Sequence, residues 1–446
     1  MSTKPPAALR PEALPPSLVA TAVRPDDPDY ARYRSGYMRG AAPGLVLRPA
    51  NVEQVGDAVR FAAGHREVPL GILSAGHGLS GRSLNHGGIV IDVGAFRGIE
   101  VLDPEAGLVR IGPAARWFEV ARELAPHGLA ISSGDYGGVG VGGIATSGGL
   151  GLLAREHGLT IDHLSAVELV LADGTAVRAD AGHHPDLFWA VRGAGANFGV
   201  VTAFEFGAPR VGKVAFARFT FDASDTAGFL RRWGEALERA PRRVGGEVIL
   251  GAPFAGRQYA QALLVVDSDD ERTIVADLQP IVDVAPLLDQ QVVLAGYDQV
   301  MAALHSDAPQ RAVGEPLSRS GLIGHLHADF AADAAALLAA GATHFFQIRS
   351  VGGAVADVPA DATAYGWRDA NFSVAAFGSP ASGLDAWWER LLPHFEGLYT
   401  SFETTTGEEV LARAFPPGHL SRLRELKRRY DPTGLFRDSF FIPPAG

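Results

Sequence analysis

Apolar residues recur along the first half of the chain with the period of a helix or that of a strand. Val52, Val55 and Val59 fall on one helical face. Asn51 precedes them and Gln54 follows three residues later, which is the spacing of an N-terminal helix cap. The same reasoning predicts strands over 88–93, 99–102, 108–111 and 200–206, helices over 117–124 and 185–192, and a hairpin over 166–180. The first half therefore reads as an α+β domain.

From about residue 212 the predicted elements become longer. β-rich runs over 214–221, 247–250, 260–266, 345–350 and 372–377 alternate with amphipathic helices over 226–239, 331–340 and 384–392. This order favours an antiparallel sheet with one face covered by helices and the other available for a ligand. A charged amphipathic helix over 420–430 follows near the end of the chain.

Composition excludes several classes of protein. The chain has 446 residues, of which 47% are apolar, and its formal net charge is −11, so phosphate-rich partners such as nucleic acids are disfavoured. It has no cysteine, which excludes disulfides, thiolate nucleophiles and cysteine-based metal sites. The proline-rich residues 1–35 are expected to form a loose arm without a signal sequence. No run of 18 apolar residues predicts a membrane span, and a cytoplasmic location is the default expectation.

Two glycine-rich turns are candidates for a ligand site. Residues 134–151 contain the G-x-G-x-x-G spacing at Gly138, Gly140 and Gly143, but a Rossmann fold requires a helix to start there. Because each further glycine inside a helix costs on the order of 1 kcal/mol, we expect an extended loop that wraps an anionic group with its N–H groups. A purely structural glycine loop is the alternative.

The second turn, Ala75-Gly76-His77-Gly78, precedes a predicted strand. Its small residues let the backbone approach a ligand closely, so the two turns could hold one dinucleotide between them. A lone histidine is more often structural than functional. The position of His77 beside a glycine turn favours the functional interpretation.

Four segments, in order along the chain, carry a resemblance to a known family. They are ILSAGHGLSGRSLNHGGIVIDV, VGVGGIATSGGLGLLAREHGLTIDHL, DLFWAVRGAGANFGVVTAFEF and RRYDPTGLFRDSFFIPP. The chain resembles the flavin-linked oxidases of the vanillyl-alcohol-oxidase superfamily, in the berberine-bridge-enzyme-like branch. The resemblance implies FAD, bonded through its 8α-methyl carbon to His77.

The resemblance also implies an α+β fold with four parts. These are an N-terminal arm (1–35), a two-part FAD-binding domain of the PCMH type (36–211), an antiparallel-sheet substrate domain backed by helices (212–410), and a C-terminal segment (411–446) that returns to the FAD domain. The implied cofactor-binding residues are Leu73, Ser74, Ala75, Gly76, His77, Gly78, Ser83, Tyr136, Val139, Gly140, Gly142, Gly143, Ser147, Gly148, Gly149, Val200 and Ser439.

Several residues depart from the family pattern, and they bear on how the flavin is attached and on how polar the active site is. Tyr136 occupies the position of a cysteine that forms a second flavin bond in many relatives, so attachment here is expected through His77 alone. Leu73 replaces an arginine, Ala75 replaces a glycine, and serines at 401 and 439 replace asparagines. These changes suggest an active site that is more apolar than usual around the flavin.

The resemblance leaves the proton acceptor unassigned. The strand over 371–376, where some relatives carry a glutamate, has no ionisable side chain, so Tyr399 and then Tyr136 are the catalytic candidates. Gln347 and Arg349 share a strand face and, with Ser373, are candidate substrate contacts. An exposed salt bridge is an equal alternative for Arg349.

One histidine-rich segment could belong to a metal site, but we do not favour this interpretation. His325 and His327 would share a face if they lay on a strand, and Asp329 follows, but no third or fourth ligand is identifiable and the implied chemistry needs no metal.

The sequence therefore predicts an FAD-dependent oxidase. It would remove a hydride from a C–H beside oxygen or nitrogen of a small alcohol, amine or secondary metabolite, with O2 as the electron acceptor. A flavin-dependent oxygenase on the same fold and a flavin-binding protein without turnover are the alternatives.

Overall fold

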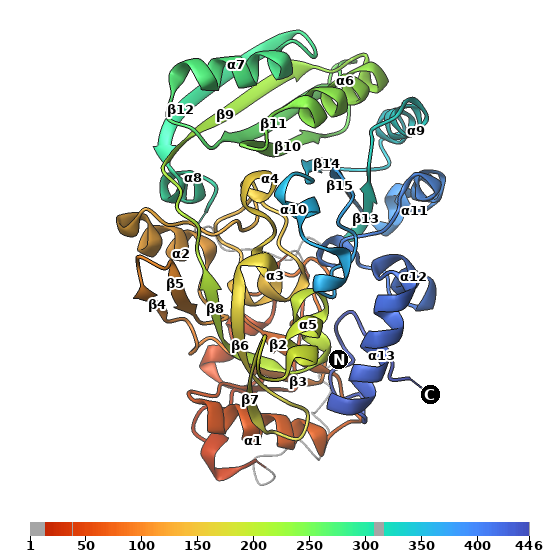
Figure 1. The fold of residues 1–446 in the computed structure, drawn as a ribbon. Coiled ribbons are helices and arrows are strands. Elements are labelled where there is room, and N and C mark those ends of the chain that lie inside the picture. The colour runs from red at the N-terminus through yellow and green to blue at the C-terminus, as the bar shows by residue number, and fades with distance from the viewer. Residues whose placement is uncertain (1–13, 38, 307–315, 446) are drawn as a thin grey trace.

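Three β-sheets organise the chain, which the computed structural model describes over residues 14–37, 39–306 and 316–445 (Figure 1). A parallel three-stranded sheet has the order β1-β3-β2, and a five-stranded antiparallel sheet has the order β4-β5-β8-β6-β7. Their strands are β1 (Leu45–Leu47), β2 (Leu70–Leu73), β3 (Ile89–Asp92), β4 (Ile99–Asp103), β5 (Leu108–Ile111), β6 (Leu164–Val170), β7 (Ala176–Asp180) and β8 (Val200–Gly207). The predicted strands of the first half are confirmed.

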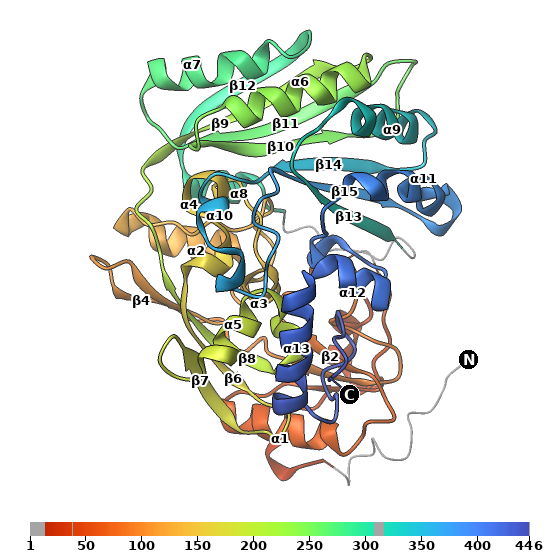
Figure 2. The same ribbon diagram turned by 45° about the vertical axis from the view of Figure 1, so that its right-hand side comes forward.

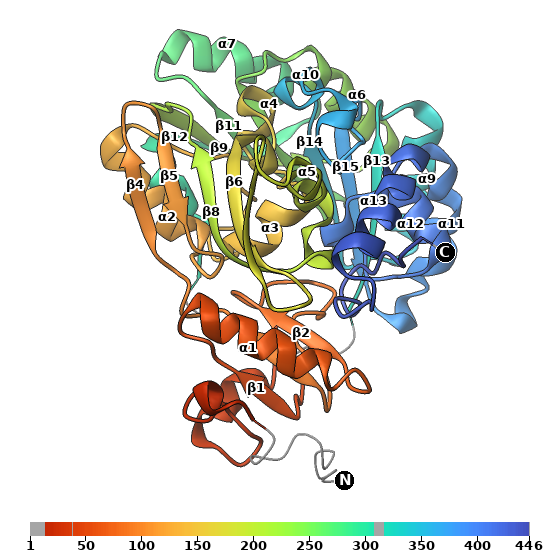
Figure 3. The same ribbon diagram turned by 60° about the horizontal axis from the view of Figure 1, so that its bottom comes forward.

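The predicted helix after Asn51 packs on the small parallel sheet as α1 (Val52–Ala63). Asn51 Oδ1 accepts a hydrogen bond from Gln54 N at 2.9 Å, and Gln54 Oε1 accepts one from Ala50 N at 2.7 Å, so the expected cap is formed. Figure 3 shows α1 beside β1 and β2.

The expectation of a loose arm is wrong for residues 14–35. Two short 3-10 helices, Pro16–Leu18 and Pro28–Tyr33, each begin with proline, whose fixed φ suits a first helical position. Between and within them Leu18, Val23 and Tyr33 are buried against the small sheet. Their apolar surface removed from water orders the segment despite its prolines. Residues 1–13 lie outside the described range.

The seven-stranded antiparallel sheet has the order β12-β9-β11-β10-β14-β15-β13. Helices α6, α7, α9 and α11 cover its outer face (Figure 2), where alternate residues such as Val248, Phe346 and Ile348 are buried. The bounds are β9 (Lys213–Asp222), β10 (Val244–Leu250), β11 (Tyr259–Val266), β12 (Leu287–Gly296), β13 (Leu317–Ile323), β14 (Phe345–Ser350), β15 (Phe372–Gly378), α6 (Thr226–Arg239), α7 (Glu271–Val282), α9 (Ala328–Ala339) and α11 (Leu384–Leu391). The prediction of a sheet with one helix-covered face is confirmed.

The glycine-rich run 134–151 is not wholly extended, which corrects the sequence expectation. Helix α3 (Val141–Ser147) begins directly after Gly140 and ends at Gly148, whose φ is 144°. A helix of seven residues contains only two of the glycines, so their cost is small enough for packing against α5 to offset it. The other helices are α2 (Trp117–Leu124), α4 (Ala154–His157), α5 (Pro185–Ala194), α8 (Tyr297–Ala303), α10 (Ala354–Asp357) and α12 (Glu408–Ala414).

The C-terminal helix α13 (Pro417–Tyr430) packs against α5 (Figure 2). Its fully buried Lys427 donates hydrogen bonds to Asp431 Oδ2 and Phe436 O at 2.8 Å, and to Asn197 O at 2.7 Å. Three such partners compensate the charge that burial removes from water. The boundaries of the four expected parts stay a prediction. Among the described residues, none of the helices is long and apolar enough to cross a membrane.

Candidate active site

A cavity of about 740 Å³ lies between the glycine-rich turns and the inner face of the seven-stranded sheet. Of the residues predicted from sequence, it is lined by Ser74, Ala75, Gly76, His77, Gly78, Ser83, Tyr136, Val139, Gly140, Gly142, Gly143, Gln347, Arg349 and Tyr399. The structure does not bring the others to its wall: Leu73, Ser147, Gly148, Gly149, Val200, Ser373 and Ser439. Gly199 and Val201, on either side of Val200, do line it. The cavity thus joins two regions that are far apart in the sequence.

The two glycine turns lie against each other. A Cβ added to Gly140 would stand 2.7 Å from the Cβ of Ala75 and 2.9 Å from Ser74 Oγ, so only glycine allows this approach. A Cβ added to Gly78 or Gly143 would meet nothing within 4 Å. The backbone at these two lining positions therefore faces open space. Such a cradle of close-set backbone fits the phosphate and ring atoms of a dinucleotide.

His77 stands at the centre of this arrangement. Its ring stacks with Tyr37 at 5.3 Å between centroids and lies 5.6 Å from the ring of Tyr136. Burial, together with the positive charges of Arg116 and His305, lowers the pKa of His77 to about 4. The imidazole is therefore neutral at pH 7, with a free electron pair on one ring nitrogen.

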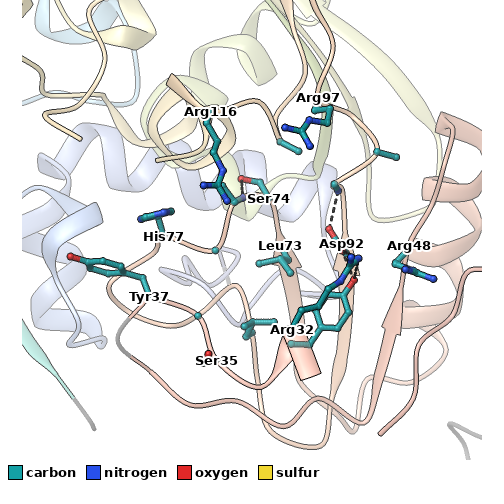
Figure 4. Close-up of a pocket in the computed structure, with 18 of the residues that line it drawn as sticks. Arg32, Ser35, Tyr37, Arg48, Leu73, Ser74, His77, Asp92, Arg97 and Arg116 are labelled. Carbon is teal, nitrogen blue, oxygen red and sulfur yellow. Dashed lines mark hydrogen bonds and ion pairs between the residues drawn. The ribbon is translucent and has the colours of Figure 1, made fainter. Parts of the chain in front are cut away.

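A second cavity, of about 840 Å³, shares the His77 turn with the first and is shown in Figure 4. Leu73 lies on its wall, and its charged lining includes Arg32, Arg48, Arg97 and Arg116. Three of these pair with carboxylates: Arg32 with Asp92 at 3.5 Å, Arg48 with Asp29 at 2.8 Å and Arg97 with Glu119 at 2.6 Å. The arginines of these ion pairs make the lining of the second cavity strongly polar.

Tyr399 lines the first cavity at the end of α3. Its Oη accepts a hydrogen bond from Gly149 N at 3.0 Å and lies 3.3 Å from Ser147 Oγ. Ser147 in turn lies 2.8 Å from Ser401 Oγ, which also lines the cavity. Ser147 therefore contacts two lining residues, Tyr399 and Ser401, but does not line the cavity itself. Tyr136 Oη, the other predicted catalytic hydroxyl, accepts from Ser306 N at 3.1 Å.

Four polar side chains converge on the sheet side of the cavity. Gln347 Nε2 donates to Asp135 Oδ2 at 2.9 Å, and Arg349 Nε donates to the same oxygen at 2.7 Å. Gln347 also donates to Glu247, which lies on β10 directly opposite Arg349. The shared face of Gln347 and Arg349 is as predicted, but both contact carboxylates of the chain itself.

Sequence reasoning missed Asp135 and Glu247. Asp135 stands next to Tyr136 in the glycine-rich run, and Glu247 lies on a predicted strand among apolar neighbours. A charged residue within such a strand was the available signal. Ser373 lies opposite Arg349 on β15, is fully buried, and does not reach the cavity.

The histidine-rich segment 325–329 is not a strand, which corrects the premise of the metal reading. His327 caps α9, its ring nitrogen accepting from Phe330 N at 3.4 Å. His325 pairs with Glu238 at 2.9 Å. No three His, Cys, Asp or Glu side chains are grouped for a metal ion in the part of the chain that the structure describes.

Comparisons with known proteins agree with this geometry. Residues 43–180 match the family model of an FAD binding domain. The chain is 27% identical over 428 residues to the (R)-6-hydroxynicotine oxidase of Paenarthrobacter nicotinovorans. This alignment covers 91% of this chain and 92% of the relative. It is 41% identical to an FAD-dependent monooxygenase of Fusarium proliferatum over 174 residues, 39% of this chain and 33% of the relative.

Solved structures share the fold across nearly the whole chain. The structure of 6-hydroxy-D-nicotine oxidase from Arthrobacter nicotinovorans superposes with a TM-score of 0.83 at 24% identity, covering 95% of this chain and 98% of the other. A chitooligosaccharide oxidase also gives 0.83, at 22% identity, covering 95% and 97%. With the glycine cradle and the matched FAD binding domain, these likenesses support an FAD-dependent oxidoreductase that is similar in fold to the FAD-linked oxidases of the vanillyl-alcohol-oxidase superfamily.

Proposed function

We propose that this protein is an oxidase whose FAD is attached by a single bond from the His77 imidazole to the flavin 8α-methyl carbon. Its substrate is a small alcohol, amine or secondary metabolite with a C–H beside oxygen or nitrogen. FAD, when bound, supplies the acceptor for a hydride and passes the electrons to O2. The chain supplies the cradle, the attachment point and the polar groups that orient the substrate.

The observation that carries the proposal is the state of His77. Bond formation at the 8α carbon requires an unprotonated imidazole nitrogen, and the lowered pKa of about 4 leaves His77 in that form at neutral pH. The rings of Tyr37 and Tyr136 both contact the His77 ring in the wall of the glycine-lined cavity. The site also fits FAD because Gly78 and Gly143 leave the backbone open toward the cavity. The absence of cysteine supports attachment through one residue.

Acid precipitation of the purified holoprotein tests the bond. We expect the yellow flavin to stay with the wild-type polypeptide and to be released completely from His77→Ala. The matched control is His344→Ala, which removes an exposed histidine that lines the same cavity on the sheet side. Release from the wild type, or retention in His77→Ala, would contradict the proposed attachment.

Oxidase activity is tested with compounds that relatives are named for. (R)-6-hydroxynicotine and xylobiose are offered anaerobically, and bleaching of the flavin absorbance reports hydride transfer. Formation of H2O2 on admission of air supports an oxidase. The likeness to a monooxygenase favours one alternative, an oxygenase, which would instead place an atom of ¹⁸O2 in the product.

A further inference from the structure

Two carboxyl groups in the cavity are held by the same two donors. Gln347 donates to both Asp135 and Glu247. Arg349 lies between them as well, with its Nε 2.7 Å from Asp135 and 3.4 Å from Glu247. Asp135 Oδ2 and Glu247 Oε2 thus share one amide nitrogen and one guanidinium nitrogen, which makes the two carboxyls close neighbours. Because a single guanidinium faces both carboxyls, we expect the pair to share one proton.

The surroundings place that proton on Glu247. Its side chain is 3% exposed, and burial followed by the negative charge of Asp135 raises its pKa well above 4.5. Asp135, 19% exposed, is also subject to burial, but the guanidinium of Arg349 outweighs this and lowers the pKa of Asp135. Two neighbouring carboxyls with their pKa values pushed apart are the pattern of an assigned acid and base.

The elements around Glu247 contribute few other charges. The strand β11 places apolar Leu263 opposite it, and β14 places Arg349 there. The charge of Asp135 also affects two tyrosines, Tyr37 and Tyr297. Among the described residues, the charged groups that act on Glu247 are therefore Asp135 and Arg349.

We propose that Glu247, paired with Asp135, is the residue that accepts the proton of the substrate's hydroxyl or amine group. This inference rests on the proposed oxidase function. It supplies the acceptor that the strand over 371–376 lacks. Glu247, Asp135 and Gln347 all line the cavity, so a bound substrate can contact the pair.

For an alcohol, the reactive state is the one in which Glu247 is a carboxylate, and this state becomes populated as the pH rises through the pKa of Glu247. The substrate C–H bond breaks and its electron pair leaves with the hydrogen as hydride, which reduces FAD, while the O–H bond breaks and its proton passes to Glu247. The substrate leaves as a carbonyl compound, or as an imine where the group is an amine. Glu247 then releases the proton, which together with the hydride equivalent that bound FAD would carry converts O2 to H2O2.

A raised pKa suits this role. A base is most effective when its pKa lies near the working pH, because it is then both ionised in part and strongly basic. Hydride transfer should accordingly become faster as the pH rises through the pKa of Glu247. Below that value the rate should change about tenfold per pH unit, as the fraction of carboxylate does.

Infrared spectra of the holoenzyme test the shared proton without any substrate. Between about pH 5 and pH 9, the C=O stretch of a protonated carboxyl should disappear in the wild type and be missing from Glu247→Gln. Asp135→Asn should lower the midpoint, because it removes the negative charge beside Glu247. The matched control is Glu403→Gln, a buried carboxyl outside the cavity whose pKa is also raised by burial. A Glu247→Gln spectrum with every wild-type band would overturn the proposal.

Anaerobic reduction by (R)-6-hydroxynicotine or xylobiose tests the transfer. We expect Glu247→Gln to keep its flavin, to be reduced about 100-fold more slowly and to lose the rise with pH, whereas Glu403→Gln should keep the wild-type profile. A wild type that is reduced beside an unaffected Glu247→Gln refutes the acceptor alone. A wild type that neither compound reduces refutes the proposed function for these substrates, and the infrared titration then decides the state of Glu247 separately.

Discussion

The two walls of the cavity differ in the kind of atoms that line them. On the FAD-binding side, backbone and small residues from two turns contact each other, with Gly140 against Ala75 and Ser74. On the sheet side, the wall consists of long polar side chains, in which Gln347 and Arg349 hold two carboxyls. A backbone wall fits a cofactor that is held in one fixed way, whereas a side-chain wall can change without altering the fold.

This difference determines which substitutions each wall tolerates. The backbone wall has no spare volume, since an added Cβ at Gly140 meets atoms at 2.7 Å. The side-chain wall depends on charge balance, because Asp135 and Glu247 are satisfied through one cation and one proton. Steric changes should therefore act mainly on the first wall, and changes of charge mainly on the second.

The largest effect is expected from Gly140→Ala. Its methyl group would overlap Ala75 and force the two turns apart, and overpacking of this kind costs about 1–3 kcal/mol. FAD must bind before the proposed bond to His77 can form, so we expect the flavin incorporated per chain to fall about tenfold when FAD is limiting, since about 1.4 kcal/mol is a factor of ten in binding. The flavin-to-protein absorbance ratio of the purified protein measures this.

Gly98→Ala is the matched control for that substitution. Gly98 is exposed, and an added Cβ there meets nothing within 4 Å. Equal flavin content in both variants would show that close approach of the turns is not what holds the cofactor.

The same contrast explains which features could be predicted from the sequence. The cap at Asn51, the helix over 226–239 and the two glycine turns follow from local spacing, so they could be predicted. The edge strand β12 could not, because its residues are largely exposed on both faces and show no alternation. Helix α3 was missed because its tertiary contacts override glycine propensity.

The pairing of Asp135 with Glu247 could not be predicted from the sequence, for a different reason. Gln347 lies 212 residues from Asp135 and 100 residues from Glu247, so only the folded sheet brings them together. A lone carboxylate on a strand predicts neither its partner nor its pKa. By contrast, His77 carries a local glycine signature, and so its position in the cavity wall could be anticipated.

A smaller effect, on stability, is expected from Glu247→Gln. The native pKa of Glu247 is raised, so the native state holds a proton that the unfolded chain releases above its usual pKa of 4.5. Wild-type stability should thus fall by up to about 1.4 kcal/mol per pH unit between those two pKa values. The variant lacks this loss, so its free energy of unfolding should rise relative to the wild type as pH increases.

Urea unfolding of the holoproteins across that pH range measures the difference. Glu389→Gln, an exposed carboxyl on α11, should follow the wild type at every pH. A constant difference between Glu247→Gln and the wild type would mean that Glu247 is ionised in the native state throughout, and the two walls would then not differ in their dependence on charge.

The smallest effect is expected where the two walls meet, at Tyr399→Phe. Tyr399 Oη accepts the Gly149 N–H at 3.0 Å, so its loss leaves that buried donor unpaired and should cost about 1 kcal/mol of unfolding free energy. Tyr365→Phe is a close control, because its ring lies 6.4 Å from that of Tyr399 and its buried hydroxyl has no hydrogen-bond partner among the described residues. That control should leave the free energy of unfolding unchanged.

If Glu247 accepts the proton, Tyr399→Phe should slow anaerobic flavin reduction less than about tenfold and keep the wild-type pH profile, because the Tyr399 hydroxyl binds the backbone at the end of α3. A loss as large as that of Glu247→Gln would instead make the tyrosine the acceptor, and the catalytic group would then belong to the flavin side of the cavity.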